Sequence, residues 1–140
     1  MPDSSVYIVS PPTLYVPSEG AAFCLVSNSK EWQDEVIGLL EKGINKALTF
    51  FVNDVEYIDP KAWIWYWHVA KNCNLIICDT IHCTDHELHM CLAMTKLELP
   101  VMFQINAGNQ ELQTLLNSIS VPYFENIEEL DELMEAVFGN

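Results

Sequence analysis

Basic residues are scarce in this sequence of 140 residues. Six lysines and arginines stand against twenty aspartates and glutamates, so the formal net charge is −14 at pH 7. A phosphate backbone is bound mainly through basic side chains that replace its counterions, and this balance therefore argues against a nucleic acid partner. The negative charge favours solubility but carries no information about the fold.

Long apolar runs and secretory features are missing as well. Half of the residues are hydrophobic, yet no apolar run approaches the roughly 20 residues that a membrane helix needs. The opening MPDSSVYIVSPP lacks a positive region followed by an apolar block. Five cysteines without a CxxC pair indicate reduced thiols and not a disulfide framework. We therefore expect a soluble, cytoplasmic protein without membrane contact.

Three common motifs of nucleotide and ester chemistry are also absent. The chain contains no GxGxxG, no GxxxxGK[ST] and no GxSxG, which disfavours dinucleotide binding, P-loop hydrolysis and serine-esterase chemistry. A flavin binder would need a phosphate-cradling loop after the first strand, where SNSKEW offers only two serines and an asparagine. We expect no cofactor.

Short apolar runs alternate with helix-period segments from residue 22 onward. AAFCLVS, LTFFV, CNLIICD and PVMFQI have the continuous apolar character of buried strands, and VPYF is a shorter fifth one. Helices are predicted over about 30–45, from behind Pro60 to about 72, after Thr84, over 110–119 and over 127–138. Right-handed crossovers place helices on both faces of a parallel sheet. The pattern therefore predicts a three-layer α/β sandwich, flavodoxin-like or Rossmann-like, with a five-stranded parallel sheet.

Residues 1–21 fit this alternation less well. Pro11 and Pro12 interrupt their apolar run, and proline is tolerated mainly at the edge of a sheet. We predict an extra N-terminal edge strand or extended arm over residues 1–21, followed by a single domain over residues 22–140.

Polar residues follow the predicted strands, and open sheets of this kind bind ligands at the carboxyl ends of their strands. Ser27, Asn28 and Ser29 have an alternative explanation, because the same residue types cap helices. The polar residues after the first four strands are Ser27, Asn28, Ser29, Asn53, Asp54, Asp79, Thr80, His82 and Asn106.

The segment HCTDHELHM, residues 82–90, allows three interpretations. Thr84 and Glu87 have the spacing of a capping box, which needs no further function. A metal site would use His86 and His89, one helical turn apart, with His82 or a neighbouring thiol. That spacing fits no closed tetrahedral zinc set, so we predict no metal there. The third interpretation makes Glu87 a catalytic carboxylate.

This third interpretation comes from a family resemblance. TDHEL, residues 84–88, resembles the T-x-x-E-L element of the nucleoside 2-deoxyribosyltransferases, in which the glutamate is the nucleophile. AAFCLVSNSKEWQDEVIGLL, WIWYWHVAKNCNLIICDT and LPVMF resemble neighbouring strands and helices of that family, so the resemblance covers about residues 22–105. It implies glycosyl transfer or hydrolysis at the N-glycosidic bond of a nucleoside or nucleotide, with Glu87 as the nucleophile.

The resemblance also implies roles for the surrounding residues. Asp79 or Asp85 would protonate the departing base, although Asp79 has the alternative of bonding to nearby backbone N–H groups. The sequence departs from the family pattern at Tyr66, Cys83 and His89. The competing hypothesis is a catalytically inactive relative that binds a nucleotide or a protein partner. The expected substrate-binding residues are Ser27, Asn28, Trp65, Thr84 and Asn106.

The segment KAWIWYWHVAK holds three of the four tryptophans. A helical wheel turns Trp63, Tyr66, Trp67 and Ala70 inward, which predicts Trp63 and Trp67 in the core. Trp65 falls on the outer stripe, where it would serve as an oligomer contact or as a wall of the ligand pocket. We therefore expect a homo-oligomer.

Overall fold

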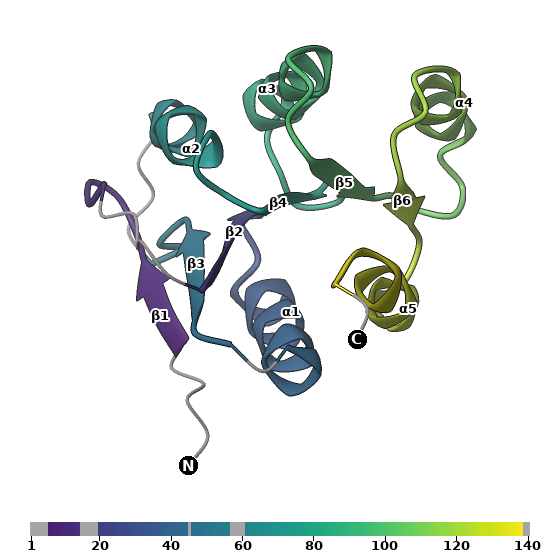
Figure 1. The fold of residues 1–140 in the computed structure, drawn as a ribbon. Coiled ribbons are helices and arrows are strands. Elements are labelled where there is room, and N and C mark those ends of the chain that lie inside the picture. Colours follow the sequence, from purple (N-terminus) through teal and green to yellow (C-terminus); the bar gives the residue numbers. More distant parts are fainter. Residues whose placement is uncertain (1–5, 15–19, 45, 57–60, 139–140) are drawn as a thin grey trace.

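Six parallel strands form one sheet in the computed structural model, which describes residues 6–14, 20–44, 46–56 and 61–138 (Figure 1). The strand order is β1-β3-β2-β4-β5-β6. The strands are β1 (Val6–Val9), β2 (Ala21–Val26), β3 (Leu48–Val52), β4 (Leu75–Asp79), β5 (Val101–Gln104) and β6 (Tyr123–Phe124). The helices are α1 (Lys30–Gly43), α2 (Ala62–Ala70), α3 (Asp85–Lys96), α4 (Gln110–Ser118) and α5 (Ile127–Phe138).

The α/β architecture with a parallel sheet is confirmed, and the layers are those of a Rossmann-like fold. Helices α2, α3 and α4 lie on one face of the sheet, and α1 and α5 lie on the other (Figure 1). The sheet has six strands and not five, because the N-terminal segment forms the edge strand that was predicted as one of two alternatives. β1 pairs with β3, in register from Val6 opposite Leu48 to Val9 opposite Phe51. β1 lies at one edge of the sheet, where prolines after a strand are tolerated.

The order of strands β2 to β6 creates a switch point at the carboxyl edge. Strands β2 and β4 are neighbours, and the helices that follow them, α1 and α3, leave toward opposite faces (Figure 1). In doubly wound sheets the crevice at such a point is the usual ligand site. The loops after β2 and β4 therefore border the usual place of a ligand site in such sheets.

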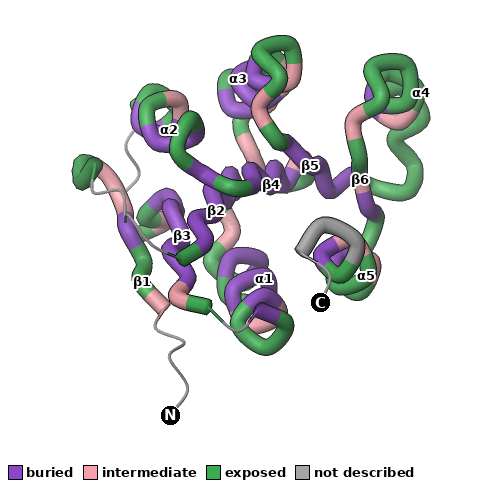
Figure 2. The backbone as a smooth tube through the Cα atoms, viewed as in Figure 1, coloured by how far each residue is buried: buried purple, intermediate pink, exposed green. Residues whose placement is uncertain are grey.

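Two hydrophobic layers hold the sheet between its helices, and the central strands are buried on both faces (Figure 2). Alternate residues of β2 point to different layers: Cys24 and Val26 belong to the layer under α2, α3 and α4, whereas Phe23 and Leu25 belong to the layer over α1 and α5. Burial on both faces explains why these strands read as continuous apolar runs.

Side chains cap the starts of α1 and α5. The Ser29 side chain accepts a hydrogen bond from Trp32 N at 3.2 Å at the start of α1. Asn126 Oδ1 accepts one from Glu129 N at 3.1 Å at the start of α5.

The helical period of residues 110–119 predicts that Leu112, Leu115, Leu116 and Ile119 face inward. Leu112 and Leu116 are buried, but Leu115 and Ile119 are 42% and 43% exposed, so that part of the prediction was wrong. Helix α4 ends at Ser118, and Ile119 is its C-cap residue.

Helix α2 is rotated relative to the helical-wheel prediction. Trp65 is only 6% exposed, whereas Trp63 is 37% exposed and Trp67 is partly buried. The prediction of Trp63 in the core and of Trp65 on the outer stripe was therefore wrong. The sequence AWIWYWHVA has hardly any polar side to fix the rotation of the helix, so packing on the sheet decides it.

Contacts of the Trp65 ring explain this rotation. Its ring lies 5.9 Å from Phe51 and 5.3 Å from Tyr66, measured between ring centroids. Its indole N–H donates to the backbone oxygen of Thr13 at 2.6 Å. A buried tryptophan needs such an acceptor for its N–H group, and the segment after β1 provides it. Residues Asp59 and Pro60, where the helix was expected to begin, and the side chain of Val137 lie outside the described residues.

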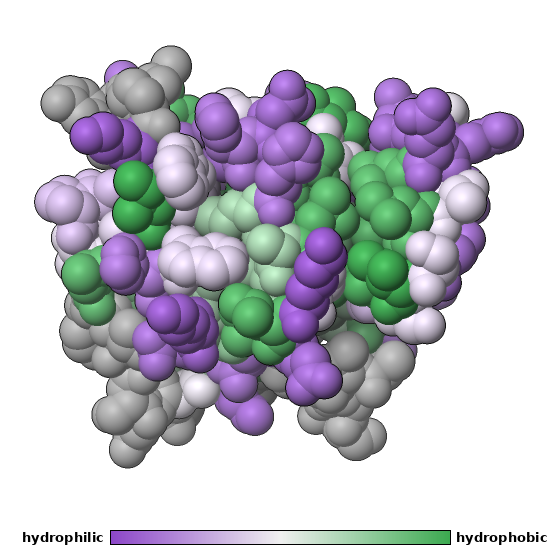
Figure 3. Space-filling view, turned by 90° about the horizontal axis from the view of Figure 1, so that it is seen from above, coloured by the Kyte–Doolittle hydropathy of each residue, from purple (hydrophilic) through white to green (hydrophobic). Residues whose placement is uncertain are grey.

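The face formed by α2, α3 and α4 carries apolar side chains among hydrophilic ones (Figure 3). Exposed apolar residues of these helices include Trp63, Ile64 and Leu115. No helix in the described part of the chain is long and apolar enough to cross a membrane.

Candidate functional site

Glu87 lies in the first turn of α3, directly after the carboxyl end of β4. Thr84 Oγ1 accepts a hydrogen bond from Glu87 N at 3.2 Å, and Glu87 Oε1 accepts one from Thr84 N at 2.9 Å. The predicted capping box is therefore confirmed. The residue is nonetheless only 3% exposed, whereas a carboxylate that serves merely as a cap is ordinarily solvated.

The two carboxylate oxygens of Glu87 differ sharply in their surroundings. Oε1 also accepts a hydrogen bond from Asn28 Nδ2 at 2.9 Å, in addition to the one from Thr84. Oε2 is buried and has no hydrogen-bond partner among the described residues. Buried polar atoms in folded proteins nearly always have a partner, so an orphaned carboxylate oxygen needs an explanation.

Asn28 connects this carboxylate with two neighbouring loops. Its Nδ2 also donates to the backbone oxygen of His82 at 3.2 Å, and its Oδ1 accepts from Asn53 Nδ2 at 2.7 Å. Asn53 follows β3, and its own Oδ1 is a second buried oxygen without a partner in the described part of the chain. Two orphaned acceptors thus belong to one hydrogen-bond network at the carboxyl edge.

Asp79 ends β4 and is completely buried. Its Oδ2 accepts from Ser27 Oγ at 2.8 Å and lies 2.7 Å from His82 Nδ1, while Oδ1 accepts from Ile81 N at 3.1 Å. The bond from a backbone N–H group matches the structural alternative considered for this residue. The contacts with Ser27 and His82 go beyond it, because they link the ends of β2 and β4.

Gln33 and Tyr66 support the site but were missed as site residues in the sequence, and Asn53 was named only as a polar residue that follows a strand. Gln33 Nε2 donates to the backbone oxygens of Ser27 and Asn53 at 2.9 and 3.1 Å, which ties β2 to β3. Asn53 N donates to the Tyr66 hydroxyl at 2.9 Å. Burial raises the pKa of Tyr66 well above its ordinary value, and the nearby Cys24 and Glu87 raise it further. For Gln33, the only signal in the sequence was a polar side chain between the inward-facing residues Trp32 and Val36.

The structure brings together only some of the residues expected from the sequence. The hydrogen-bond network contains Ser27, Asn28, Asp79, Thr84 and Glu87. In the described part of the chain the other three expected residues form no hydrogen bond with this network. Asp85 is exposed at the start of α3, Asn106 is exposed before α4, and Trp65 bonds to Thr13.

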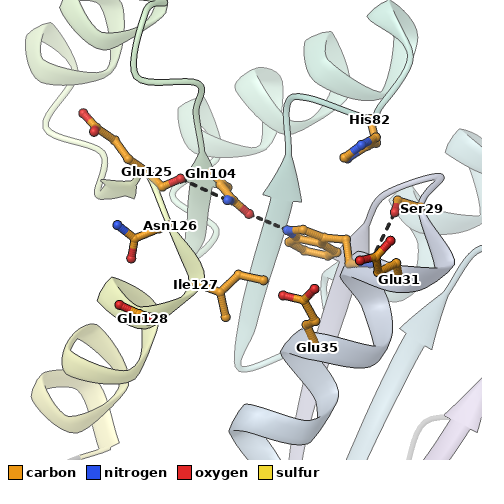
Figure 4. Close-up of a pocket in the computed structure, with 10 residues that line it drawn as sticks. Ser29, Glu31, Glu35, His82, Gln104, Glu125, Asn126, Ile127 and Glu128 are labelled. Atoms are coloured by element: carbon orange, nitrogen blue, oxygen red, sulfur yellow. Dashed lines mark hydrogen bonds between the residues drawn. The ribbon is translucent and has the colours of Figure 1, made fainter.

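A cavity of about 660 Å³ opens beside this network, between the first turns of α1 and α5 (Figure 4). We call it the α1–α5 cavity. The Trp32 indole N–H donates to Gln104 Oε1, and Gln104 Nε2 donates to the backbone oxygen of Glu125 at 3.1 Å, so these side chains are held in place. The lining residues are Ser29, Glu31, Trp32, Glu35, His82, Gln104, Glu125, Asn126, Ile127 and Glu128.

The remaining histidines of the HCTDHELHM segment lie elsewhere. His86 stacks on Trp63, with ring centroids 5.9 Å apart, and both line a separate apolar pocket with His89 between α2 and α3. Among the described residues, no three histidine, cysteine, aspartate or glutamate side chains come together as metal ligands.

No protein-family model matches the sequence, and no curated protein matches it either.

Proposed function

We propose that this chain is a nucleoside 2-deoxyribosyltransferase-like protein, with the flavodoxin-like variant of the sandwich, that acts on the N-glycosidic bond of a nucleoside or nucleotide. The reaction is glycosyl transfer or hydrolysis, and Glu87 is the nucleophile. The observation that carries the proposal is the buried, unpartnered Oε2 of this residue. A capping box uses one carboxylate oxygen, so capping leaves the second unexplained.

The hydrogen bonds of Glu87 suit a nucleophile. Oε1 is held by Thr84 N and Asn28 Nδ2, which fixes the direction of Oε2 before a substrate arrives. A prepositioned carboxylate oxygen can attack the anomeric carbon as the base departs, and the covalent glycosyl-enzyme is then resolved by water or by an acceptor. The orphaned Oδ1 of Asn53 is available to accept a hydrogen bond from a sugar hydroxyl.

The capping box favours a second candidate, a catalytically inactive relative that binds a nucleotide or a protein partner. Its complete geometry accounts for a threonine and a glutamate at this spacing without chemistry. In this candidate a bound ligand donates a hydrogen bond to Glu87 Oε2, and no bond is broken.

Base release from a panel of nucleosides and nucleotides, followed by chromatography, separates the two candidates. We expect release by the wild type and a loss by orders of magnitude in Glu87→Gln, because an amide cannot attack an anomeric carbon. The glutamine oxygen still accepts the two N–H bonds, so the melting temperature stays close to that of the wild type. Glu87→Ala removes both bonds and is destabilised by about 1–2 kcal/mol.

Glu129→Gln is the matched control. Glu129 has the corresponding capping position in α5, where its side chain accepts from Glu125 N at 2.9 Å, but neither of its oxygens is buried without a partner in the described structure. Its replacement should leave turnover unchanged. Wild-type turnover in Glu87→Gln would reject the nucleophile, and a wild type inactive on the whole panel would select the binding relative.

Self-association and a cytoplasmic location also remain proposals. The buried Trp65 is not available to a partner, so the exposed Trp63 and Ile64 on the same helix are the apolar residues that a homo-oligomer would cover. Sedimentation of the wild type and of Ile64→Lys tests this, since a monomer in both samples would exclude self-association.

A further inference from the structure

His82 and Asp79 contact each other, and the proposed role of Glu87 as nucleophile does not explain this contact. His82 Nδ1 lies 2.7 Å from Asp79 Oδ2, and the histidine side chain is 49% exposed while the carboxylate is fully buried. Asp79 is held from two further sides by Ser27 Oγ and Ile81 N. A rigid carboxylate therefore orients a side chain that solvent and ligands can reach.

This contact decides which nitrogen of His82 is free. A carboxylate oxygen accepts hydrogen bonds, so this contact favours the tautomer of His82 that carries a hydrogen on Nδ1. Nε2 is then left to take up or give a proton. A carboxylate-oriented imidazole of this kind is a common proton carrier in enzymes.

His82 is also one of the residues that line the α1–α5 cavity. His82 lines that cavity with Ser29 and Trp32, and its ring points toward the α1 side (Figure 4). The volume of about 660 Å³ lies within the range of small-molecule sites. An indole wall and the polar edges of Gln104 and Asn126 suit a planar heteroaromatic base, whereas the four lining glutamates repel a phosphate.

Asn28 relates this cavity to the proposed nucleophile. One amide group, Nδ2, donates both to Glu87 Oε1 at 2.9 Å and to the backbone oxygen of His82 at 3.2 Å. Glu87 does not line the cavity, whereas His82 does. Displacement at an anomeric carbon requires a nucleophile on one side and the leaving group on the other.

We propose that His82, positioned by Asp79, is the general acid of this site and that the α1–α5 cavity holds the departing base. The inference rests on the proposed function. As Glu87 Oε2 bonds to the anomeric carbon, the bond from that carbon to the base nitrogen breaks and its electron pair stays on the base. The base takes a proton from His82 Nε2. In the hydrolytic step, water bonds to the anomeric carbon, Glu87 is released as a carboxylate, and His82 takes back a proton from that water.

The test uses chemical rescue on the nucleoside that the wild type cleaves best. His82→Ala should slow base release by about 10²–10⁴-fold, and added imidazole should restore part of the rate, because the partly exposed side chain leaves an accessible space. Asp79→Asn should slow base release by a comparable factor, because the imidazole of His82 would take the wrong tautomer. Added imidazole should not rescue this variant, since its histidine is still present. His89→Gln, an exposed histidine of α3, is the control and should match the wild type.

Three results would overturn the inference. A rate for His82→Ala within a few-fold of the wild type would exclude the general acid, and so would a loss that imidazole does not restore while melting is normal. Ile127→Trp narrows the cavity and should raise KM, so an unchanged KM would place the base elsewhere. If the wild type cleaves nothing, the proposed function itself fails. If Glu87→Gln is inactive but His82→Ala is normal, only this inference fails.

Discussion

Replacement of Tyr66 by phenylalanine tests the link between helix α2 and the candidate site. The variant keeps the ring, and with it the contact to Trp65 at 5.3 Å between centroids. It removes the hydroxyl that accepts the hydrogen bond from Asn53 N at 2.9 Å. Asn53 is almost fully buried, so its N–H group is left without an acceptor and without water.

An unsatisfied buried N–H group costs about 1–3 kcal/mol. For a domain of this size such a loss lowers the melting temperature by about 3–10 °C. Urea unfolding followed by circular dichroism gives the free energy directly, and the slope should not change because the exposed surface is the same.

Tyr123→Phe serves as the comparison. The Tyr123 hydroxyl also accepts a hydrogen bond, from Gln113 Nε2 at 3.0 Å, but the residue is partly exposed and water can replace the lost acceptor. We expect a cost below about 0.5 kcal/mol. Equal midpoints for Tyr66→Phe and the wild type, or equal losses in both variants, would refute the proposed role of the buried hydroxyl.

Three further predictions concern helix rotation, alkaline stability and thiol reactivity. Trp65→Ala should cost about 3–5 kcal/mol and Trp63→Ala at most about 1 kcal/mol by urea unfolding, and similar costs would contradict the rotation of α2. Burial raises the pKa of Tyr66 above its ordinary 10.0, so the contribution of Tyr66 to stability is fully present below pH 10. It is lost at higher pH, where the unfolded chain releases a proton that the folded chain keeps. Between pH 10 and higher pH, the urea midpoint should therefore fall less steeply in Tyr66→Phe than in the wild type. Burial likewise raises the pKa of the fully buried Cys24 thiol, so iodoacetamide on the native protein should label the partly exposed Cys83 and spare Cys24, as peptide mass spectrometry would show.

Local sequence patterns were sufficient for most of the secondary structure. Strands buried on both faces are continuous apolar runs wherever they lie in a sheet, so β2, β4 and β5 were recognisable without knowledge of their neighbours. Capping boxes depend on residues three positions apart, so the start of α3 was predictable from Thr84 and Glu87.

The sequence also predicted that the candidate site residues lie at one edge of the sheet. Ser27, Asp79 and Glu87 follow predicted strands, and the carboxyl ends of parallel strands share one edge. Sequence position alone did not say which of these side chains touch. Asn28 and Glu87 are separated by 59 residues in the chain, and local sequence patterns do not predict a contact between residues so far apart.

Only the tertiary structure decided the rotation of α2, the pairing of β1 and the environment of the Glu87 carboxylate. A helix that is apolar on nearly every side has no preferred face until it meets a sheet, and Trp65 turned inward because Thr13 offered its N–H group an acceptor. Residues 6–9 became a strand because β3 presented an unpaired edge. The sequence by itself determined where backbone hydrogen bonds form locally. The orphaned oxygen of Glu87 and the contact of Asp79 with His82 arose from long-range packing, which sets burial and therefore reactivity.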